Sequence, residues 1–240
     1  MRWEDMLVRK EILDLAVAYN ISHIAPAFSC TELITFLYEH VLTKNDKFIL
    51  SKGHGCLSLY VALRHKGYNP SIKSHPDIER KEGIECTTGS LGHGLPMGVG
   101  MALAKKITNT KDRVFVLMSD GECEEGTTWE SLLIATQHHL DNLCVVVDYN
   151  KLQALDRIVL SLHDLKKKFE SFNCSVVEID GHDFDEISKA VNQIGGYKPL
   201  IIIAHTIKGK GVSFMENKPE WHTRIPQGEL LVQAYKELEE

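Results

Sequence analysis

Apolar residues follow two different spacings that alternate along the chain. In residues 3–19 they recur at the spacing that turns one face of a helix toward a core. The same spacing predicts further helices over residues 31–42, 56–67, 94–107, 127–139, 162–172, 184–194 and 229–240. Unbroken runs of Val, Ile and Leu predict strands over residues 113–118, 142–149, 174–180 and 199–206.

Local signals refine this pattern at two places. We expect Thr31 to cap the helix that follows it, because a threonine hydroxyl can accept a hydrogen bond from the free amides of a first helical turn. Residues 69–88 show neither spacing and contain Pro70, Pro76 and Gly83. We therefore expect a loop over this segment.

The alternation of helices and strands predicts an α/β fold with a doubly wound, mostly parallel sheet. Strands that read as continuous apolar runs are buried on both faces, which requires helices on both sides of the sheet. A chain of 240 residues can bury one such core, and we expect a single domain over residues 1–240. In this architecture ligands bind beyond the carboxyl ends of the strands.

The composition argues against several classes of protein. A net charge of -6 disfavours a dedicated nucleic-acid-binding protein, which would carry a basic face. The longest apolar runs have strand length, and the first residues lack the apolar core of a signal peptide, so we expect no membrane span and a cytoplasmic protein. Six scattered cysteines without a Cys-x-x-Cys pair favour buried, reduced thiols.

Polar residues follow two of the predicted strands at the expected ligand-binding edge. Asp120 and Gly121 come after strand 113–118, and Asn150 follows the next strand. Magnesium prefers oxygen ligands and is often shared with substrate phosphates, which the backbone at a glycine can approach closely. An Asp-Gly pair alone is as readily an ordinary turn. The asparagine after a second strand favours a metal and diphosphate site.

Several sequence motifs carry a family resemblance. The segment SDGECEEG, followed by YNKLQ, resembles the thiamine diphosphate signature. The segments LSKGHGCLSLYVAL, HPD, ECTTGSLGHGLPMGVGMALAKK, IDGHDF and AHTIKGKGVSFMENKPEWH are similar in order and spacing to the amino-terminal, diphosphate-binding half of transketolase. The resemblance runs from about Ser22 to Pro226 and implies the thiamine diphosphate-binding fold.

The resemblance implies roles for individual residues. It assigns Mg2+, or Ca2+ or Mn2+ in its place, to Asp120, Asn150 and the main-chain carbonyl of Leu152. The positions implied to lie beside the thiamine diphosphate cofactor are Gly89, Leu91, Gly121, Glu122, Asn150, Lys208, His54 and His222. Glu125 and Glu130 match carboxylates at a subunit contact.

Four histidines match the family's catalytic histidines. His54 and His222 match positions near the diphosphate and the reacting carbon, and His23 and His75 match positions that contact substrate hydroxyls or move protons. Transfer of a ketol unit moves protons among oxygens near neutral pH, a task for which histidine is suited. A single histidine would more often be structural, but four in loops beside regular elements favour the catalytic interpretation.

The resemblance also implies a partner. Enzymes of this kind need a pyrimidine-binding domain, whose glutamate acts on the cofactor, and we expect a separate carboxy-terminal transketolase subunit to supply it. The chain alone should then be inactive. We expect a dimer of heterodimers, in keeping with the closed symmetry of most oligomers.

The sequence departs from the family pattern in places. SHIAPAFS replaces the usual Gly-His-Pro-Gly-Gly, which weakens the role of His23, and Ser119, Asp156 and Thr223 stand where glycine is common. The connections before SKGH, between HKGY and HPD, and after NKLQAL look short. Since short loops widen the mouth of such a site, we expect a sugar larger than simple sugar phosphates.

Three functional interpretations follow. The favoured one is a subunit of a split transketolase that transfers a two-carbon ketol unit between sugars. The cofactor subunit of a 2-oxo-acid decarboxylase or dehydrogenase is a second, although such an enzyme has little need of histidines directed at hydroxyls. A non-catalytic scaffold is a third, supported only by the altered SHIAP segment.

Overall fold

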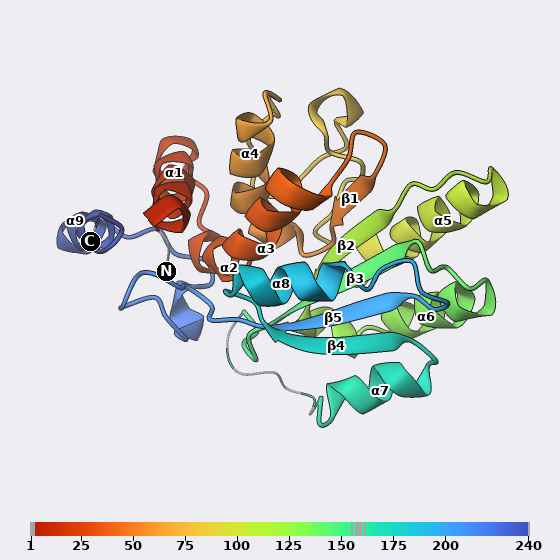
Figure 1. The fold of residues 1–240 in the computed structure, drawn as a ribbon. Helices are drawn as coiled ribbons and strands as arrows, with labels where there is room; N and C mark the ends of the chain where they lie inside the picture. Colours follow the sequence, from red (N-terminus) through yellow and green to blue (C-terminus); the bar gives the residue numbers. More distant parts are fainter. Residues whose placement is uncertain (1–2, 155, 157–159, 161, 240) are drawn as a thin grey trace.

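Parallel strands form the central sheet of the computed structural model, which describes residues 3–154, 156, 160 and 162–239 (Figure 1). Within these residues the sheet has five strands in the order β1-β2-β3-β5-β4, and every neighbouring pair is parallel. The strands are β1 (Lys47–Leu50), β2 (Val114–Ser119), β3 (Leu143–Tyr149), β4 (Ser175–Asp180) and β5 (Leu200–His205). The parallel arrangement confirms the fold class predicted from the apolar runs.

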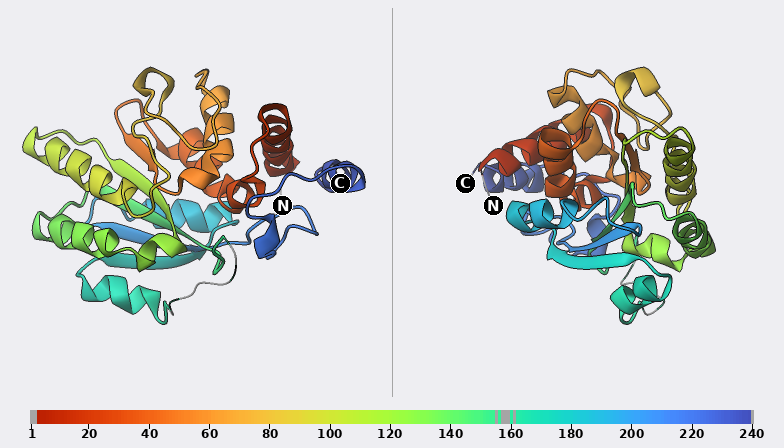
Figure 2. Two further views of the ribbon diagram at one scale, coloured as in Figure 1. Left: turned by 180° about the vertical axis from the view of Figure 1, so that it is seen from behind. Right: turned by 45° about the vertical axis from the view of Figure 1, so that its right-hand side comes forward.

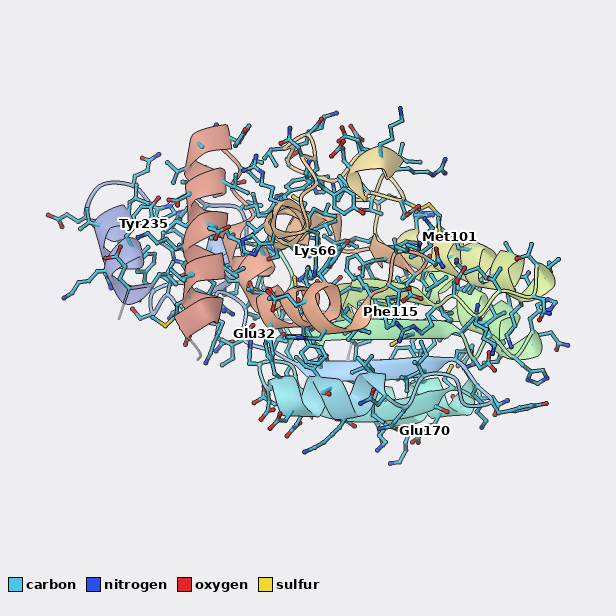
Figure 3. All side chains as sticks on the ribbon, turned by 45° about the horizontal axis from the view of Figure 1, so that its top comes forward. Glu32, Lys66, Met101, Phe115, Glu170 and Tyr235 are labelled. Carbon is cyan, nitrogen blue, oxygen red and sulfur yellow. The ribbon has the colours of Figure 1, made fainter. Side chains whose placement is uncertain are left out.

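Helices cover both faces of the sheet, as the sequence predicts. Their bounds are α1 (Trp3–Tyr19), α2 (Ile24–Ser29), α3 (Thr31–Phe36), α4 (Cys56–His65), α5 (Gly94–Ile107), α6 (Gly126–Gln137), α7 (Leu165–Ser171), α8 (Phe184–Val191) and α9 (Glu229–Glu237). Seen from the side, α5 and α6 lie together on one face and α8 lies on the other (Figure 2). Helix α9 lies beside α1, where the Tyr235 hydroxyl donates to the Asp14 carboxylate at 2.7 Å (Figure 3).

Alternate residues of each central strand point into two different cores. On β2, Val114 and Val116 join the core formed with α5, α6 and α7, whereas Phe115 and Leu117 join the core formed with α1 to α4 and α8. All four side chains are fully buried. This is the two-residue period of a strand with both faces covered, and it explains why the strand reads as an unbroken apolar run.

One local prediction is wrong, and a second is confirmed with a small addition. Thr31 does not cap α3: it is the first helical residue, and its hydroxyl donates to the Ala27 carbonyl oxygen at 3.1 Å. Helix α2, which the apolar spacing does not predict, ends just before Thr31 and takes the place of the extended chain that a capping residue would need. The expected loop over residues 69–88 is present apart from a short 3-10 turn at Arg80–Glu82 and a bridge between Glu79 and Ile84.

The cysteines agree with the expectation of buried, reduced thiols. All six cysteines are buried and free of disulfides. None of the described helices has both the length and the apolar character needed to cross a membrane. The last residue of the expected C-terminal helix, Glu240, lies outside the described residues.

Two glycines of α5 give a test of the helix packing. A β-carbon at Gly98 would collide with the Val116 side chain on β2, whereas one at Gly100 would meet no atom within 4 Å. We expect Gly98→Ala to lower the free energy of unfolding by about 1–3 kcal/mol through overpacking. Gly100→Ala should raise it by roughly 0.5–1 kcal/mol, because alanine loses less backbone entropy in a helix. Urea unfolding measures both, and equal effects would contradict the packing described.

Candidate active site

A cavity of about 460 Å³ opens at the carboxyl edge of the sheet, where the fold class places ligands. Its volume lies in the usual range for small-molecule sites. The residues predicted from the sequence that line it are His54, Leu91, Asp120, Gly121, Asn150, Leu152, Lys208 and His222. These residues are up to 168 positions apart in the sequence, from His54 to His222, and the strand ends bring them together.

The predicted metal ligands lie at the ends of two neighbouring strands. Asp120 follows β2 and Asn150 follows β3, and the two strands pair up to Ser119 and Asp148. The Lys151 amide donates to Asp120 Oδ2 at 2.6 Å, which ties the carboxylate to the chain after β3. Burial and the nearby Asp148 carboxylate raise the pKa of Asp120 to about 7. A cation beside Asp120 would offset this unfavourable burial of negative charge.

The chemistry of this donor set suits a hard cation. Asp120 offers a carboxylate oxygen, Asn150 an amide oxygen and Leu152 a main-chain carbonyl, and all three residues line the cavity. Magnesium and calcium take such oxygen ligands. In the described part of the chain, no group of three His, Cys, Asp or Glu side chains converges in a way that could hold a metal ion. A site of the zinc type is therefore not found among those residues.

Glu122 is placed differently from the other predicted cofactor contacts. Its side chain is fully buried and does not line the cavity. It accepts hydrogen bonds from the Ser51 hydroxyl, the Ser119 amide (2.8 Å) and the Gly92 amide (3.0 Å). The carboxylate thus fixes the short turn Asp120–Glu124 against two other loops. Ser119, which stands where glycine is common in the family, completes this turn as its capping residue.

The four predicted histidines converge on one another. The ring centroid of His23 lies 5.3 Å from that of His75, 5.4 Å from that of His222 and 6.3 Å from that of His54. The rings of His54 and His222 are also 5.4 Å apart. His23 Nδ1 is buried and has no hydrogen-bond partner among the described residues. Four separate segments therefore bring imidazole rings into one cluster beside the cavity.

The environment keeps three of these rings neutral at pH 7. Burial and the neighbouring His75 lower the pKa of His23 to about 4. Burial and the Lys208 ammonium lower the pKa of His222 to about 3. Burial, together with Lys52, also holds the pKa of His54 well below its ordinary value. Neutral imidazoles can both accept and donate hydrogen bonds, which suits proton transfer to and from oxygen.

Lys208 orients His222. The Lys208 ammonium is buried, donates to His222 Nδ1 at 2.7 Å and also donates to the main-chain oxygen of Gln153 at 2.9 Å. Because an ammonium group has no lone pair, Nδ1 must be the acceptor and the proton of the neutral ring resides on Nε2. Burial and the Lys52 charge lower the pKa of Lys208 to about 8, so it stays mostly protonated at pH 7.

The remaining predicted positions lie around the cavity. Gly89 has a φ of 133°, and a β-carbon there would lie 2.9 Å from the His75 ring, so this glycine supports the histidine cluster. Leu91 lines the cavity with 38% of its surface exposed. Glu125 lies at the cavity edge, and both Glu125 and Glu130 are exposed, which agrees with their predicted role at a subunit contact without testing it.

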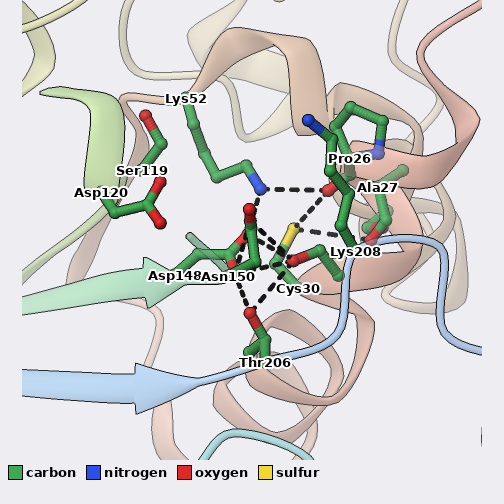
Figure 4. Close-up of polar contacts among 12 residues, drawn as sticks. Pro26, Ala27, Cys30, Lys52, Ser119, Asp120, Asp148, Asn150, Thr206 and Lys208 are labelled. Carbon is green, nitrogen blue, oxygen red and sulfur yellow. Dashed lines mark hydrogen bonds and ion pairs between the residues drawn. The ribbon is translucent and has the colours of Figure 1, made fainter. Parts of the chain in front are cut away.

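One part of the site escaped the sequence interpretation. Behind the cavity the buried Lys52 ammonium forms an ion pair with the Asp148 carboxylate (Figure 4). The hydroxyls of Ser29 and Thr206 also donate to Asp148. The available signal was the aspartate inside the apolar run LCVVVDY, which no helix or strand period explains. A charge at a fully buried strand position requires a partner.

The shortened connection after NKLQAL lies partly outside the described residues. Asp156, which stands where glycine is common, is described and lines the cavity.

Titration of His222 tests the arrangement of Lys208. We expect Lys208→Met to raise the pKa of His222, because it removes a cation that lowers it. Nuclear magnetic resonance titration of the imidazole signals measures this, with Lys210→Met as the control because Lys210 is not among the groups that shift His222. A His222 pKa near 6.5 in the unaltered chain, or an equal response to both replacements, would contradict the geometry.

The lowered pKa values also predict how stability depends on pH. The unfolded chain takes up protons near pH 6.5 at His23 and His222, but the folded chain takes them up only near pH 4 and pH 3. Below pH 6.5 the unfolded state therefore binds more protons, and the free energy of unfolding should fall as the pH decreases toward 4. Urea unfolding across this range measures the fall, and the replacement of His23 by Gln should make it less steep.

Comparison with known proteins indicates the family of this chain. Residues 17–237 match the family model described as transketolase, thiamine diphosphate binding domain. One subunit of the apulose-4-phosphate transketolase of Phocaeicola vulgatus is 35% identical, over 97% of this chain and 91% of that protein. The 6-deoxy-6-sulfo-D-fructose transketolase subunit SqwG of Clostridium sp. is 36% identical, over 97% of this chain and 94% of that protein.

A solved structure shares the fold. The transketolase of Campylobacter jejuni superimposes with a TM-score of 0.86 at 26% identity, over 98% of this chain and 42% of that one. The chain thus spans about two fifths of the length of that enzyme. From the family match over most of its length and from the residues gathered at the cavity, the chain belongs to the transketolase family and carries its thiamine diphosphate-binding domain.

Proposed function

We propose that this chain is the cofactor-binding subunit of a split transketolase. With a partner subunit it transfers a two-carbon ketol unit from a ketose donor to an aldose acceptor. The observation that carries the proposal is the convergence of four histidines beside a cavity that also presents Asp120 and Asn150. Both groups occur together at the carboxyl edge of one parallel sheet, where such chemistry needs them.

The cavity fits the family's cofactor. Oxygen donors from Asp120, Asn150 and Leu152 would hold a magnesium ion, and Gly121 leaves room for a diphosphate beside it. The Lys208 ammonium on the cavity wall, together with a metal ion held at Asp120, would attract the anionic diphosphate. Bound thiamine diphosphate supplies the nucleophilic carbon that allows a bond next to a carbonyl to break and form.

The histidines of this chain would bind the substrate and transfer protons to and from its oxygens. His54 and His222 line the cavity, His23 lies against both of them, and His75 lies against His23. A neutral imidazole can take a proton from a sugar hydroxyl and return it to a carbonyl oxygen. His222, with its Nε2 proton fixed by Lys208, can donate to an oxygen from that atom. His23 Nδ1 is buried without a hydrogen-bond partner among the described residues, and the altered SHIAP segment still places the His23 ring in the histidine cluster.

A separate partner chain completes the proposal. Two relatives that this chain covers over 91% and 94% of their length are named as single subunits of a transketolase. We infer that the pyrimidine-binding domain comes from another polypeptide here as well, and that the exposed Glu125 and Glu130 face a neighbouring protomer. The dimer of heterodimers, the magnesium ion, the single domain over residues 1–240 and the cytoplasmic location remain predictions from the sequence.

The substrates are expected to be modified sugars. The relatives are named for apulose 4-phosphate and for 6-deoxy-6-sulfo-D-fructose, so a sugar bearing a phosphate or sulfonate group is the first class to test. The larger sugar expected from the short connections stays a prediction. A 2-oxo acid fits less well, because it has few hydroxyl groups for four clustered imidazoles to contact. A scaffold without catalysis would not require the histidine cluster to persist.

Cofactor binding provides the first test. We expect calorimetry to detect thiamine diphosphate with Mg2+ only when the partner subunit is present, and Asp120→Ala to weaken that binding by more than about a hundredfold, because a direct metal ligand is lost. Asp77→Ala is the matched control, since Asp77 is exposed and forms an ion pair with Lys73 on the surface. The absence of binding in the wild-type pair would refute the cofactor-binding role.

Substrate turnover provides the second test. The reconstituted pair should transfer a ketol unit between phosphorylated or sulfonated sugars and should not release carbon dioxide from 2-oxo acids. Coupled assays with ketose donors and aldose acceptors, run beside pyruvate and 2-oxoglutarate, measure this. Decarboxylation of a 2-oxo acid without sugar transfer would favour the second interpretation of the sequence.

A further inference from the structure

The side chain of Asn150 has two ends that look alike in shape but differ in chemistry. Its amide oxygen can bind a cation, whereas its NH2 group can only repel one. Asn150 is mostly buried at the end of β3, with 9% of its surface exposed. A metal site that uses Asn150 therefore requires interactions that keep its amide oxygen facing the cavity.

Asp148 lies two residues before Asn150, behind the cavity wall. It is fully buried, and three groups donate to it: the Lys52 ammonium and the hydroxyls of Ser29 and Thr206 (Figure 4). Lys52 also donates to the main-chain oxygen of Pro26 at 3.0 Å. Because a carboxylate only accepts hydrogen bonds, these donors fix Asp148 in its ionised form and in one position.

Ser29 connects Asp148 to the side chain of Asn150 through hydrogen bonds. Its hydroxyl hydrogen is directed to the Asp148 carboxylate, whose two oxygens lie 2.7 and 2.8 Å away. The Ser29 oxygen then retains only lone pairs, and Asn150 Nδ2 donates to it at 3.2 Å. Asn150 Nδ2 also lies 3.4 Å from Asp148 Oδ1. Both groups on this side of the amide accept hydrogen bonds, so the NH2 group must face them.

The opposite side of the amide carries a donor. The Leu152 amide donates to Asn150 Oδ1 at 3.1 Å. A reversed side chain would set the amide oxygen against the Asp148 carboxylate and the NH2 group against the Leu152 N–H. An amide oxygen has two lone pairs, so one remains available after the bond from Leu152. Asn150 also lines the cavity together with Asp120.

We propose that Ser29 and Asp148, the latter held by Lys52, are positioning residues that turn the Asn150 oxygen toward the metal position. The role rests on the proposed function, since it concerns the same metal site. Groups that orient a metal ligand are often as important as the ligand itself, and their loss lowers metal affinity. Neither Ser29 nor Asp148 lines the cavity, so both act through Asn150.

Metal affinity of the assembled enzyme tests this role. The complex of this chain with its partner and thiamine diphosphate is titrated with Mn2+ as wild type, Ser29→Ala and Thr206→Val. The two variants are matched, because each removes one hydroxyl from Asp148 but only Ser29 receives the Asn150 amide. We expect Ser29→Ala to weaken Mn2+ binding by about tenfold or more, and Thr206→Val to weaken it far less.

The outcomes separate the two proposals. If the wild-type complex takes up no Mn2+ with the cofactor, the proposed function and the positioning role both fall. If the wild type binds Mn2+ and the two variants lose affinity equally, or Ser29→Ala loses none, only the positioning role falls.

A second measurement needs neither metal nor partner. Nuclear magnetic resonance of the whole chain labelled with 15N at asparagine detects the Asn150 side-chain protons, which are assigned by their loss in Asn150→Asp. We expect contacts from these protons to the Ser29 side chain and slowed exchange with water. Contacts to the Leu152 amide proton in their place would show the reversed orientation and overturn the inference, even if Ser29→Ala failed to fold.

Discussion

The buried ion pair between Lys52 and Asp148 is the interaction on which the site depends. Neither side chain is exposed, and removing one partner of such a pair typically costs about 3–5 kcal/mol because the other charge is left without compensation. The pair links the turn after β1 to the end of β3, and through Ser29 and Thr206 it reaches α2 and the end of β5. Four separate elements therefore converge on one carboxylate directly behind the cavity.

A second buried network supports the same edge of the sheet. Arg9 on α1 forms an ion pair with Glu32 on α3 at 2.8 Å, and Glu32 also accepts from His182 Nδ1 at 2.9 Å. His182 Nε2 then accepts from the Ile207 amide at 2.9 Å. Ile207 immediately precedes Lys208, so this network anchors the backbone that presents the active-site lysine. Charges buried in the amino-terminal helices thus contribute to the geometry of a residue about two hundred positions later.

The sequence was sufficient for the class of fold and for about half of the residues that line the cavity, because strand composition and motif spacing are local features. It was insufficient where structure depends on distant partners. Lys52 and Asp148 are 96 residues apart, and nothing local pairs them. Helix α2 is too short to show a period, and its presence displaced Thr31 from the expected cap. Glu122 follows the metal-site aspartate closely in sequence, yet its side chain turns inward because Ser51 and Ser119 satisfy it there.

The six buried thiols can report local unfolding of this fold. The thiolate is the reactive form of cysteine, and burial raises the pKa of Cys30 to about 11 and that of Cys144 to about 12. An alkylating reagent can therefore reach these residues only when the surrounding structure opens. Cys144 sits in the middle of the sheet, whereas Cys30 follows α2 behind the cavity. The order in which the thiols become modified would rank the local stabilities of sheet and site within one native molecule.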